Sequence, residues 1–169
     1  ASYSATGFKG IVIFVSIGII ATIAMQSSHA TIVLVIAALS VGQIAYESAL
    51  LITIGANIGT TITAVLGSLN SNIEGKRLAG AHFLFNLISG VIAIIVLGPT
   101  MLAVDSIGNF LGIAQDDFTL KLAVFDTFFK IAGVLMFLPF MKQFVLLLNT
   151  VLKDRPKNKD KNLEIIQYL

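Results

Sequence analysis

The chain alternates between long apolar runs and short polar segments, and this alternation limits the possible folds more than any other feature. Residues 78–97 and 120–140 are almost continuously apolar, and residues 8–25 form a shorter apolar run. An α-helix rises about 1.5 Å per residue, so about 20 residues cross a hydrocarbon core of about 30 Å. The two longer runs therefore predict full transmembrane helices, and residues 8–25 cover most of the same distance.

The composition agrees with a lipid environment. Apolar residues make up 56% of the chain, charged residues only 12%, and the mean hydropathy is +0.93. Water-soluble domains carry about 25% charged residues. The absence of cysteine excludes disulfides, thiolate metal sites and cysteine nucleophiles. Lys and Arg are densest in the C-terminal tail and not on an aromatic-rich face, so we expect no nucleic-acid binding. We predict an all-α, polytopic membrane protein.

The first polar interruption is Gln26-Ser27-Ser28-His29, which lies between two apolar pieces. Backbone groups in lipid must find partners, so such an interruption survives only against protein or a water-filled cavity. It predicts a broken or re-entrant helix, whose free backbone and hydroxyl groups suit an oxyanion or a hard cation. The alternative for Ser27 and Ser28 is helix packing through small residues. For His29, ligand contact and helix capping stay equally open.

A second interruption is expected at Gly55-Ala56-Asn57-Ile58-Gly59-Thr60-Thr61. Its two glycines permit backbone conformations and close approaches that other residues forbid. Its Asn and Thr side chains add one amide and two hydroxyls. A helix restarting at Ile58 or Thr60 would point its N–H groups at an anion, and the preceding helix end could hold Na⁺ through its carbonyl oxygens.

The region around both interruptions is poor in charge. No Lys or Arg lies between Gly10 and Gly75, and between Gly10 and Glu74 only His29 and Glu47 have side chains that charge near neutral pH. An anion site built there from hydroxyls and backbone dipoles lacks a fixed cation. A co-bound Na⁺ would supply the compensating charge and so couple the two ligands.

The two late spans share a pattern. Ala79-x-x-His82-x-x-Phe85-Asn86 corresponds to Ala123-x-x-Asp126-x-x-Phe129-Lys130. This internal repeat indicates related packing elements. We expect His82 and Asn86 to form hydrogen bonds between helices, with a functional role as the alternative. Asp126 and Lys130 are four residues apart, which predicts an ion pair on one helix face, with an ion pathway as the alternative.

Three polar segments complete the expected organisation. Residues 68–77 form an aqueous loop, and residues 100–119 are mixed in character and predict an amphipathic segment at the membrane interface. We expect residues 1–152 to be the transmembrane unit. Residues 153–169 are rich in charge and predict a cytoplasmic linker that leads into a soluble helical domain.

The two interruptions resemble motifs of the sodium/phosphate cotransporter family, which includes the type II transporters of animal epithelia and bacterial relatives. That family carries Gln-Ser-Ser-Ser in each of two inverted repeats, followed by Gly-[Ala/Ser]-Asn-Ile-Gly-Thr-[Thr/Ser]. Gln26-Ser27-Ser28 matches the first motif, with His29 in place of its third serine, and residues 55–61 match the second completely. Residues 81–86 are similar to the family's His-x-x-Phe-Asn segment, and the resemblance covers roughly residues 9–140.

The resemblance implies a symporter that carries inorganic phosphate with Na⁺ as the coupling ion, without another cofactor, in a plasma membrane such as the bacterial inner membrane. The substrate and ion residues it implies are Gln26, Ser27, Ser28, His29, Asn57, Thr60 and Thr61. Gly55 and Gly59 would shape the backbone, and Na⁺ would lie near Ser27, Ser28, Asn57 and Thr60. His82 and Asn86 are further candidates.

Each motif occurs once, so we expect this chain to be one repeat, the second half of a transporter. A complementary repeat or an antiparallel second copy would supply the other half of the site. The alternative is a non-transporting scaffold that signals through a C-terminal cytosolic domain. We expect no enzyme activity, because adjacent Ser28 and His29 do not form a nucleophile–base pair and no Gly-x-Ser-x-Gly motif is present.

Overall fold

The computed structural model describes residues 7–153, and every regular element in this range is a helix, as the sequence predicted. The elements are α1 Gly7–Met25, α2 Ser28–Ser40, α3 Tyr46–Ser68, α4 Ile73–Ile95, α5 Leu97–Phe110, α6 Phe118–Phe137, the 3₁₀ helix η1 Leu138–Phe140 and α7 Met141–Val151. Residues 154–169, which include nearly all of the predicted linker, lie outside the described residues.

Four helical stretches of the described chain are long and apolar enough to cross a membrane: α1, α3, α4 and Phe118–Val151. The predicted span at residues 78–97 coincides with α4 except for its last two residues, and the predicted span at residues 120–140 lies within Phe118–Val151. Two pieces that the sequence suggested were parts of broken helices, α1 and α3, also reach spanning length. Many of their large apolar side chains are exposed, including Ile20, Leu78 and Leu135, as is expected of a surface that faces lipid. The protein is therefore a membrane protein.

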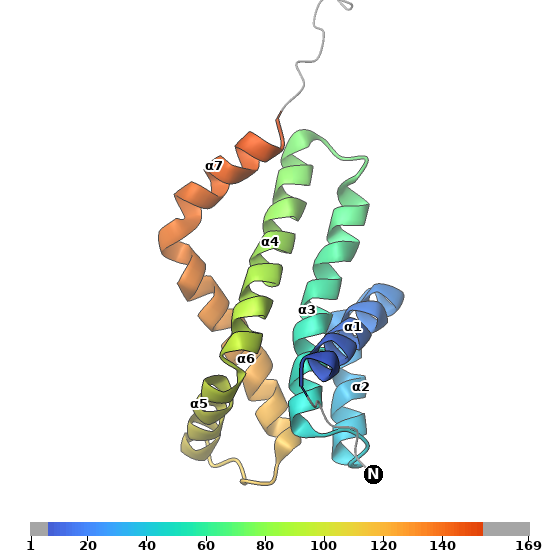
Figure 1. The fold of residues 1–169 in the computed structure, drawn as a ribbon, viewed down its shortest axis with the longest axis vertical. Helices are drawn as coiled ribbons and strands as arrows, with labels where there is room; N and C mark the ends of the chain where they lie inside the picture. The colour runs from blue at the N-terminus through green and yellow to red at the C-terminus, as the bar shows by residue number, and fades with distance from the viewer. Residues whose placement is uncertain (1–6, 154–169) are drawn as a thin grey trace, which may run out of the picture.

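Helix α3 is the centre of the fold. Figure 1 shows it between α4 on one side and the α1–α2 pair on the other. Every residue from Ser48 to Gly59 is buried, so the helix is covered on all sides over three turns. A helix that is buried all round needs no polar face. Polar residues on it therefore lie inside the protein, next to other helices.

Glycines bring the backbones of α1 and α3 into contact. A Cβ added at Gly18 would lie 2.0 Å from the carbonyl oxygen of Ile52, and one added at Gly55 would lie 2.1 Å from that of Val15. Gly59 faces Ile19 in the same way, at 2.8 Å. Small residues four apart allow this close packing in membranes, where van der Waals contact and not the hydrophobic effect drives helix association.

The second half of the chain forms a hairpin of α5 and α6, with α7 beyond it. Lys121 on α6 is buried, its Nζ lies 2.7 Å from Oδ1 of Asp105 on α5, and it donates to the carbonyl of Gln115 at 2.8 Å. Asp117 caps α6 by accepting from the Leu120 N–H at 3.0 Å. That bond, with a second from the Thr119 hydroxyl, holds the pKa of Asp117 below its usual value.

Helix α7 continues from α6 through a bend. Pro139 lies in η1, between the two helices, and Figure 1 shows the change of direction there. Proline lacks the N–H that would continue the α-helical ladder, which accounts for the bend. Residues 141–151 therefore form a separate helix at an angle to α6.

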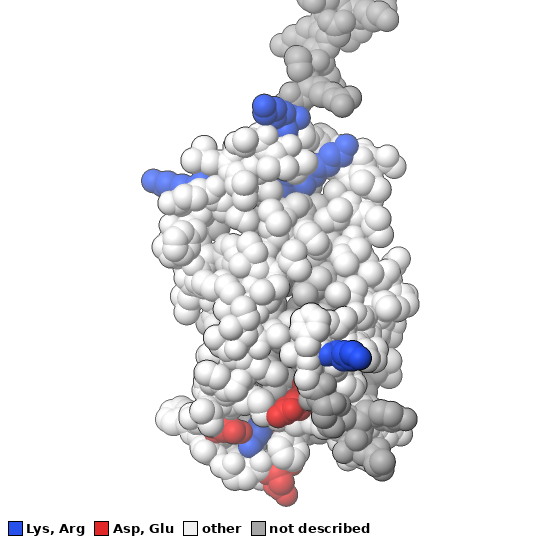
Figure 2. Space-filling model, viewed as in Figure 1, with Lys and Arg blue, Asp and Glu red and all other residues white. Residues whose placement is uncertain are grey.

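Charged residues gather at the two ends of the molecule. On the face in Figure 2, Lys and Arg lie mainly at the end where α4 begins and α7 ends, and the acidic residues lie toward the opposite end. The first end carries Lys76, Arg77, Lys142 and Lys153. The opposite end, where α5 meets α6, carries Asp105, Asp116 and Asp117. The surface between them carries few charges, among them Lys9 and the Lys130 side chain.

Candidate functional site

The first polar interruption is confirmed. Helix α1 ends at Met25 and α2 begins at Ser28, so Gln26 and Ser27 form the turn between them. Gln26 has a φ of +52° and is the one non-glycine residue with positive φ in the described part of the chain. Such a backbone conformation is uncommon outside glycine and costs about 1 kcal/mol or more, and it is often found at functional sites.

Ser27 caps the start of α2. Its Oγ accepts a hydrogen bond from the Ala30 N–H at 3.2 Å. The N–H groups of Ser28 and His29 belong to the same first turn, which has no preceding helical carbonyls to bond. They lie at the positive end of the α2 dipole, which favours an anion. Since Ser27 is the cap, His29 does not fill that role, and its side chain is exposed.

Two buried threonines join α1 to α2 behind the turn. The hydroxyls of Thr22 and Thr31 lie 2.8 Å apart, and that of Thr31 also donates to the carbonyl of Ser27 at 3.2 Å. Because Thr31 has a single hydroxyl proton, Thr22 must be the donor to Thr31. Sequence reasoning missed this pair. The sequence could have indicated it, because Thr22 and Thr31 are polar residues that lie close to the interruption, one on each side.

The second interruption is not present, and the prediction of a helix restart at Ile58 or Thr60 was wrong. Helix α3 is continuous from Tyr46 to Ser68. Its polar side chains bond carbonyls of the same helix: the Thr60 hydroxyl donates to Ala56 at 3.2 Å and the Thr61 hydroxyl to Ile58 at 2.6 Å. Gly55 and Gly59 pack against the backbone of α1, so the predicted close approach is confirmed. Both glycines are helical, so the predicted special backbone conformation is not found. No second helix N-terminus therefore points at an anion here.

The depth of the turn follows from the helix lengths. Figure 1 shows α2 running back alongside α3 from the turn to the connection that joins them. Ser28 lies about 18 Å from the end of α2, and Asn57 lies about 16 Å from the start of α3, at 1.5 Å per residue. Because the two helices pack against each other, Ser28 and Asn57 lie at similar depth. Asn57 is also the middle residue of α3, so this depth is near the centre of the span.

Asn57 links α3 to α6. Its Nδ2 donates to the carbonyl of Thr53 at 3.0 Å and to Oδ1 of Asp126 at 3.1 Å. Both neighbours are acceptors, which fixes the orientation of the amide. Oδ2 of Asp126 lies 2.5 Å from Nζ of Lys130, so the predicted ion pair on one helix face is confirmed. The contact with Asn57 was not predicted.

His82 and Asn86 lie apart from this contact. The buried Asn86 donates from Nδ2 to the carbonyl of His82 at 3.1 Å, a bond within α4 and not the predicted bond between helices. The His82 side chain is exposed. Gly90 of α4 faces Ile54 and Ile58 of α3, so Gly90 lies at the depth of Asn57, and Asn86 lies about one helical turn, ~6 Å, away from that depth.

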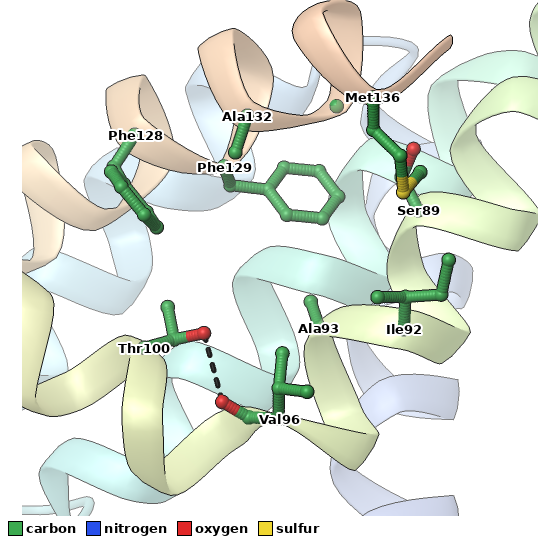
Figure 3. A pocket seen from close by; sticks show the side chains of 10 residues that line it. Ser89, Ile92, Ala93, Val96, Thr100, Phe128, Phe129, Ala132 and Met136 are labelled. Atoms are coloured by element: carbon green, nitrogen blue, oxygen red, sulfur yellow. Dashed lines mark hydrogen bonds between the residues drawn. The ribbon is translucent and has the colours of Figure 1, made fainter.

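A cavity of about 200 Å³ lies between α4, the start of α5 and α6. Figure 3 shows Phe128, Phe129 and Met136 along one side of it and Thr100 and Ala93 along the other. The Thr100 hydroxyl donates to the carbonyl of Val96 at 2.9 Å. This apolar lining carries no charged group, so it is unsuited to an anion, and the polar candidates lie elsewhere.

Comparison with known proteins points to one family. A family model described as Na⁺/Pi-cotransporter matches residues 3–143. Among similar proteins, the uncharacterised protein YqeW of Bacillus subtilis is 29% identical over 136 residues, which are 80% of this chain and 42% of the relative. The putative inorganic phosphate export protein YjbB of Escherichia coli is 27% identical over 83% of this chain and 25% of its own length.

A mammalian relative is similar over a shorter region. The sodium-dependent phosphate transport protein 2A of Ovis aries is 37% identical over 92 residues, which are 52% of this chain and 14% of the relative. The chain therefore spans less than half of the length of each of these relatives. No solved structure matches it significantly.

Proposed function

The chain belongs to the Na⁺/Pi-cotransporter family, and on that premise we propose that it carries half of the site of a secondary transporter that moves inorganic phosphate together with Na⁺. The family match supports phosphate as the substrate. The names of the relatives differ on direction, since one is called an export protein and another a sodium-dependent transport protein.

One observation carries the proposal. The N-terminus of α2 lies near the middle of the membrane span, at the depth of Asn57 on α3. Transporters of this kind place substrate near the bilayer midplane, where the N-termini of discontinuous helices face anionic groups. The N–H groups of Ser28 and His29, with the side chains of Gln26 and Ser27, would hold the phosphate. No Lys or Arg lies between Gly10 and Gly75, so these residues supply no fixed cation and a co-bound Na⁺ would compensate the anion.

The Na⁺ would bind beside the phosphate, near Ser27, Ser28, Asn57 and Thr60. The Thr60 hydroxyl donates its proton to Ala56 and keeps its lone pairs as acceptors. Thr61 does the same toward Ile58 at a fully buried position. A complementary repeat, or an antiparallel second copy, would close the site from the other side. We propose that the protein lies in a plasma membrane, with its Lys- and Arg-rich end on the cytoplasmic side.

Uptake of labelled phosphate into vesicles that contain the complete gene product tests the proposal. We expect uptake that rises with an inward Na⁺ gradient and falls when choline replaces Na⁺. Ser28→Ala together with Asn57→Ala should remove most of it. Ser40→Ala is the matched control, because it deletes an exposed hydroxyl at the far end of the same helix. Phosphate uptake that ignores Na⁺, or that survives the double substitution, contradicts the proposal.

Phosphate export is the second candidate function, favoured by the name of the Escherichia coli relative. Vesicles loaded with labelled phosphate and assayed for efflux without a Na⁺ gradient distinguish it from Na⁺-driven uptake. A scaffold that transports nothing gives no phosphate flux in either assay.

A further inference from the structure

The carboxylate of Asp126 presents its two oxygens to different partners. Oδ1 accepts from the Asn57 amide on α3, whose own position is fixed by its second bond to the Thr53 carbonyl. Oδ2 faces Nζ of Lys130, one turn further along α6. One oxygen is therefore held by the neighbouring helix, and the other is available to a cation.

This ion pair lies deeper than the other two in the described residues. Asp126 contacts Asn57, the central residue of α3, whereas the Arg77–Glu74 and Lys121–Asp105 pairs lie toward the ends of the molecule. An isolated carboxylate at mid-depth of a membrane is costly and requires a compensating cation. Ionisable groups at that depth also commonly mark ion pathways.

Lys130 is held much less firmly than the other lysine of α6. The side chain of Lys121 is 3% exposed, it pairs with Asp105 and donates to the Gln115 carbonyl. The side chain of Lys130 is 43% exposed, and within residues 7–153 it pairs only with Asp126, whose side chain is 16% exposed. The Lys130 ammonium therefore has one ion-pair partner and no backbone acceptor in the described residues, so fewer contacts hold it than hold the Lys121 ammonium.

We propose that Oδ2 of Asp126 is a binding site for a monovalent cation, and that the Lys130 ammonium occupies this site in competition with Na⁺. The proposal rests on the proposed function, since it assigns a cation site beside Asn57 to the same transporter. Carboxylate oxygen is a hard ligand that suits Na⁺, and Asn57 positions it. Lys130 thereby acts as a tethered competitor that weakens Na⁺ binding and lowers the dependence of the protein on Na⁺.

Na⁺ titration of thermal stability tests this competition. The complete gene product is purified in detergent and melted at increasing Na⁺ concentration, with choline holding the ionic strength constant. Lys130→Met should lower the Na⁺ concentration for half-maximal stabilisation about tenfold, because the competing ammonium has been removed. Lys142→Met removes one exposed lysine elsewhere and should leave this concentration unchanged.

The double variant Asp126→Asn with Lys130→Met is the control for misfolding, because it removes both charges of the ion pair and leaves neither one unpaired. It should fold and lose the Na⁺ response that the single Lys130→Met variant gains. The proposal is overturned if Lys130→Met responds to Na⁺ as the wild type does, or if the double variant keeps the gained response. The readout needs no phosphate flux, so a protein that transports nothing contradicts the proposed function and leaves this test intact.

Discussion

The Thr22 and Thr31 hydroxyls hold the α1–α2 turn together at the scale of single residues. Both side chains are buried, and each hydroxyl has a defined place in a chain of hydrogen bonds that ends on the Ser27 carbonyl. A buried hydroxyl that loses its partner costs about 1–3 kcal/mol. The position of the Ser27 backbone at the turn thus depends on two buried side chains behind it.

Replacing Thr31 by Val keeps the shape of the side chain and strands the Thr22 hydroxyl, so we expect Thr31→Val to lower the stability by about 1–3 kcal/mol. Thr22→Val combined with Thr31→Val should cost less than the sum of the single changes, because no unpaired hydroxyl remains. Thermal melting of all four proteins in detergent measures this coupling. Strictly additive effects would show that the hydroxyl contact contributes nothing.

At the scale of whole helices, the two interruptions show what local sequence can predict. The first was predicted correctly, because four successive polar residues that include a capping serine favour the end of one helix and the start of the next. The second was wrong, because glycine, asparagine and threonine lower helix propensity by amounts that packing can exceed. Gly18 of α1 meets α3 beside this run, and no local pattern reveals a partner from another helix. The Asn57–Asp126 contact, 69 residues apart in sequence, was missed for the same reason.

The contact between α1 and α3 predicts opposite effects for two glycines of the same helix. At Gly55 a Cβ would lie 2.1 Å from the Val15 carbonyl oxygen, a backbone atom that cannot move aside. We expect Gly55→Ala to separate the helices and to cost about 3 kcal/mol or more. At Gly67 nothing lies within 4 Å, so Gly67→Ala should stabilise α3, by about 1 kcal/mol at most.

Melting temperatures of the two alanine variants in one detergent provide the measurement, with phosphate uptake as a second readout. Gly55→Ala should also impair uptake, since α1 carries the turn that it would displace. Equal melting temperatures for Gly55→Ala and Gly67→Ala would mean that the backbones of α1 and α3 are not in contact.

For the molecule as a whole, the uneven charge distribution sets the expected orientation. The connection between α3 and α4 and the end of α7 lie at the end that carries Lys76, Arg77 and Lys142. The connection between α5 and α6 lies at the other end, near the start of α3, where the rings of Tyr46 and Phe118 are 5.2 Å apart. Loops rich in Lys and Arg stay in the cytoplasm, so the first end should be cytoplasmic.

Two single cysteines can report this orientation, because the chain contains none of its own. Ser71→Cys lies in the exposed connection before α4, and Asp116→Cys lies in the exposed connection before α6. In a complete gene product otherwise free of cysteine, a membrane-impermeant maleimide added to intact cells should label position 116 and not position 71. Inverted vesicles should give the reverse. Labelling of both positions from one side would contradict a span between them, and labelling of position 71 alone in intact cells would invert the orientation. The second result would place the connection between α2 and α3 on the cytoplasmic side instead of the outer side.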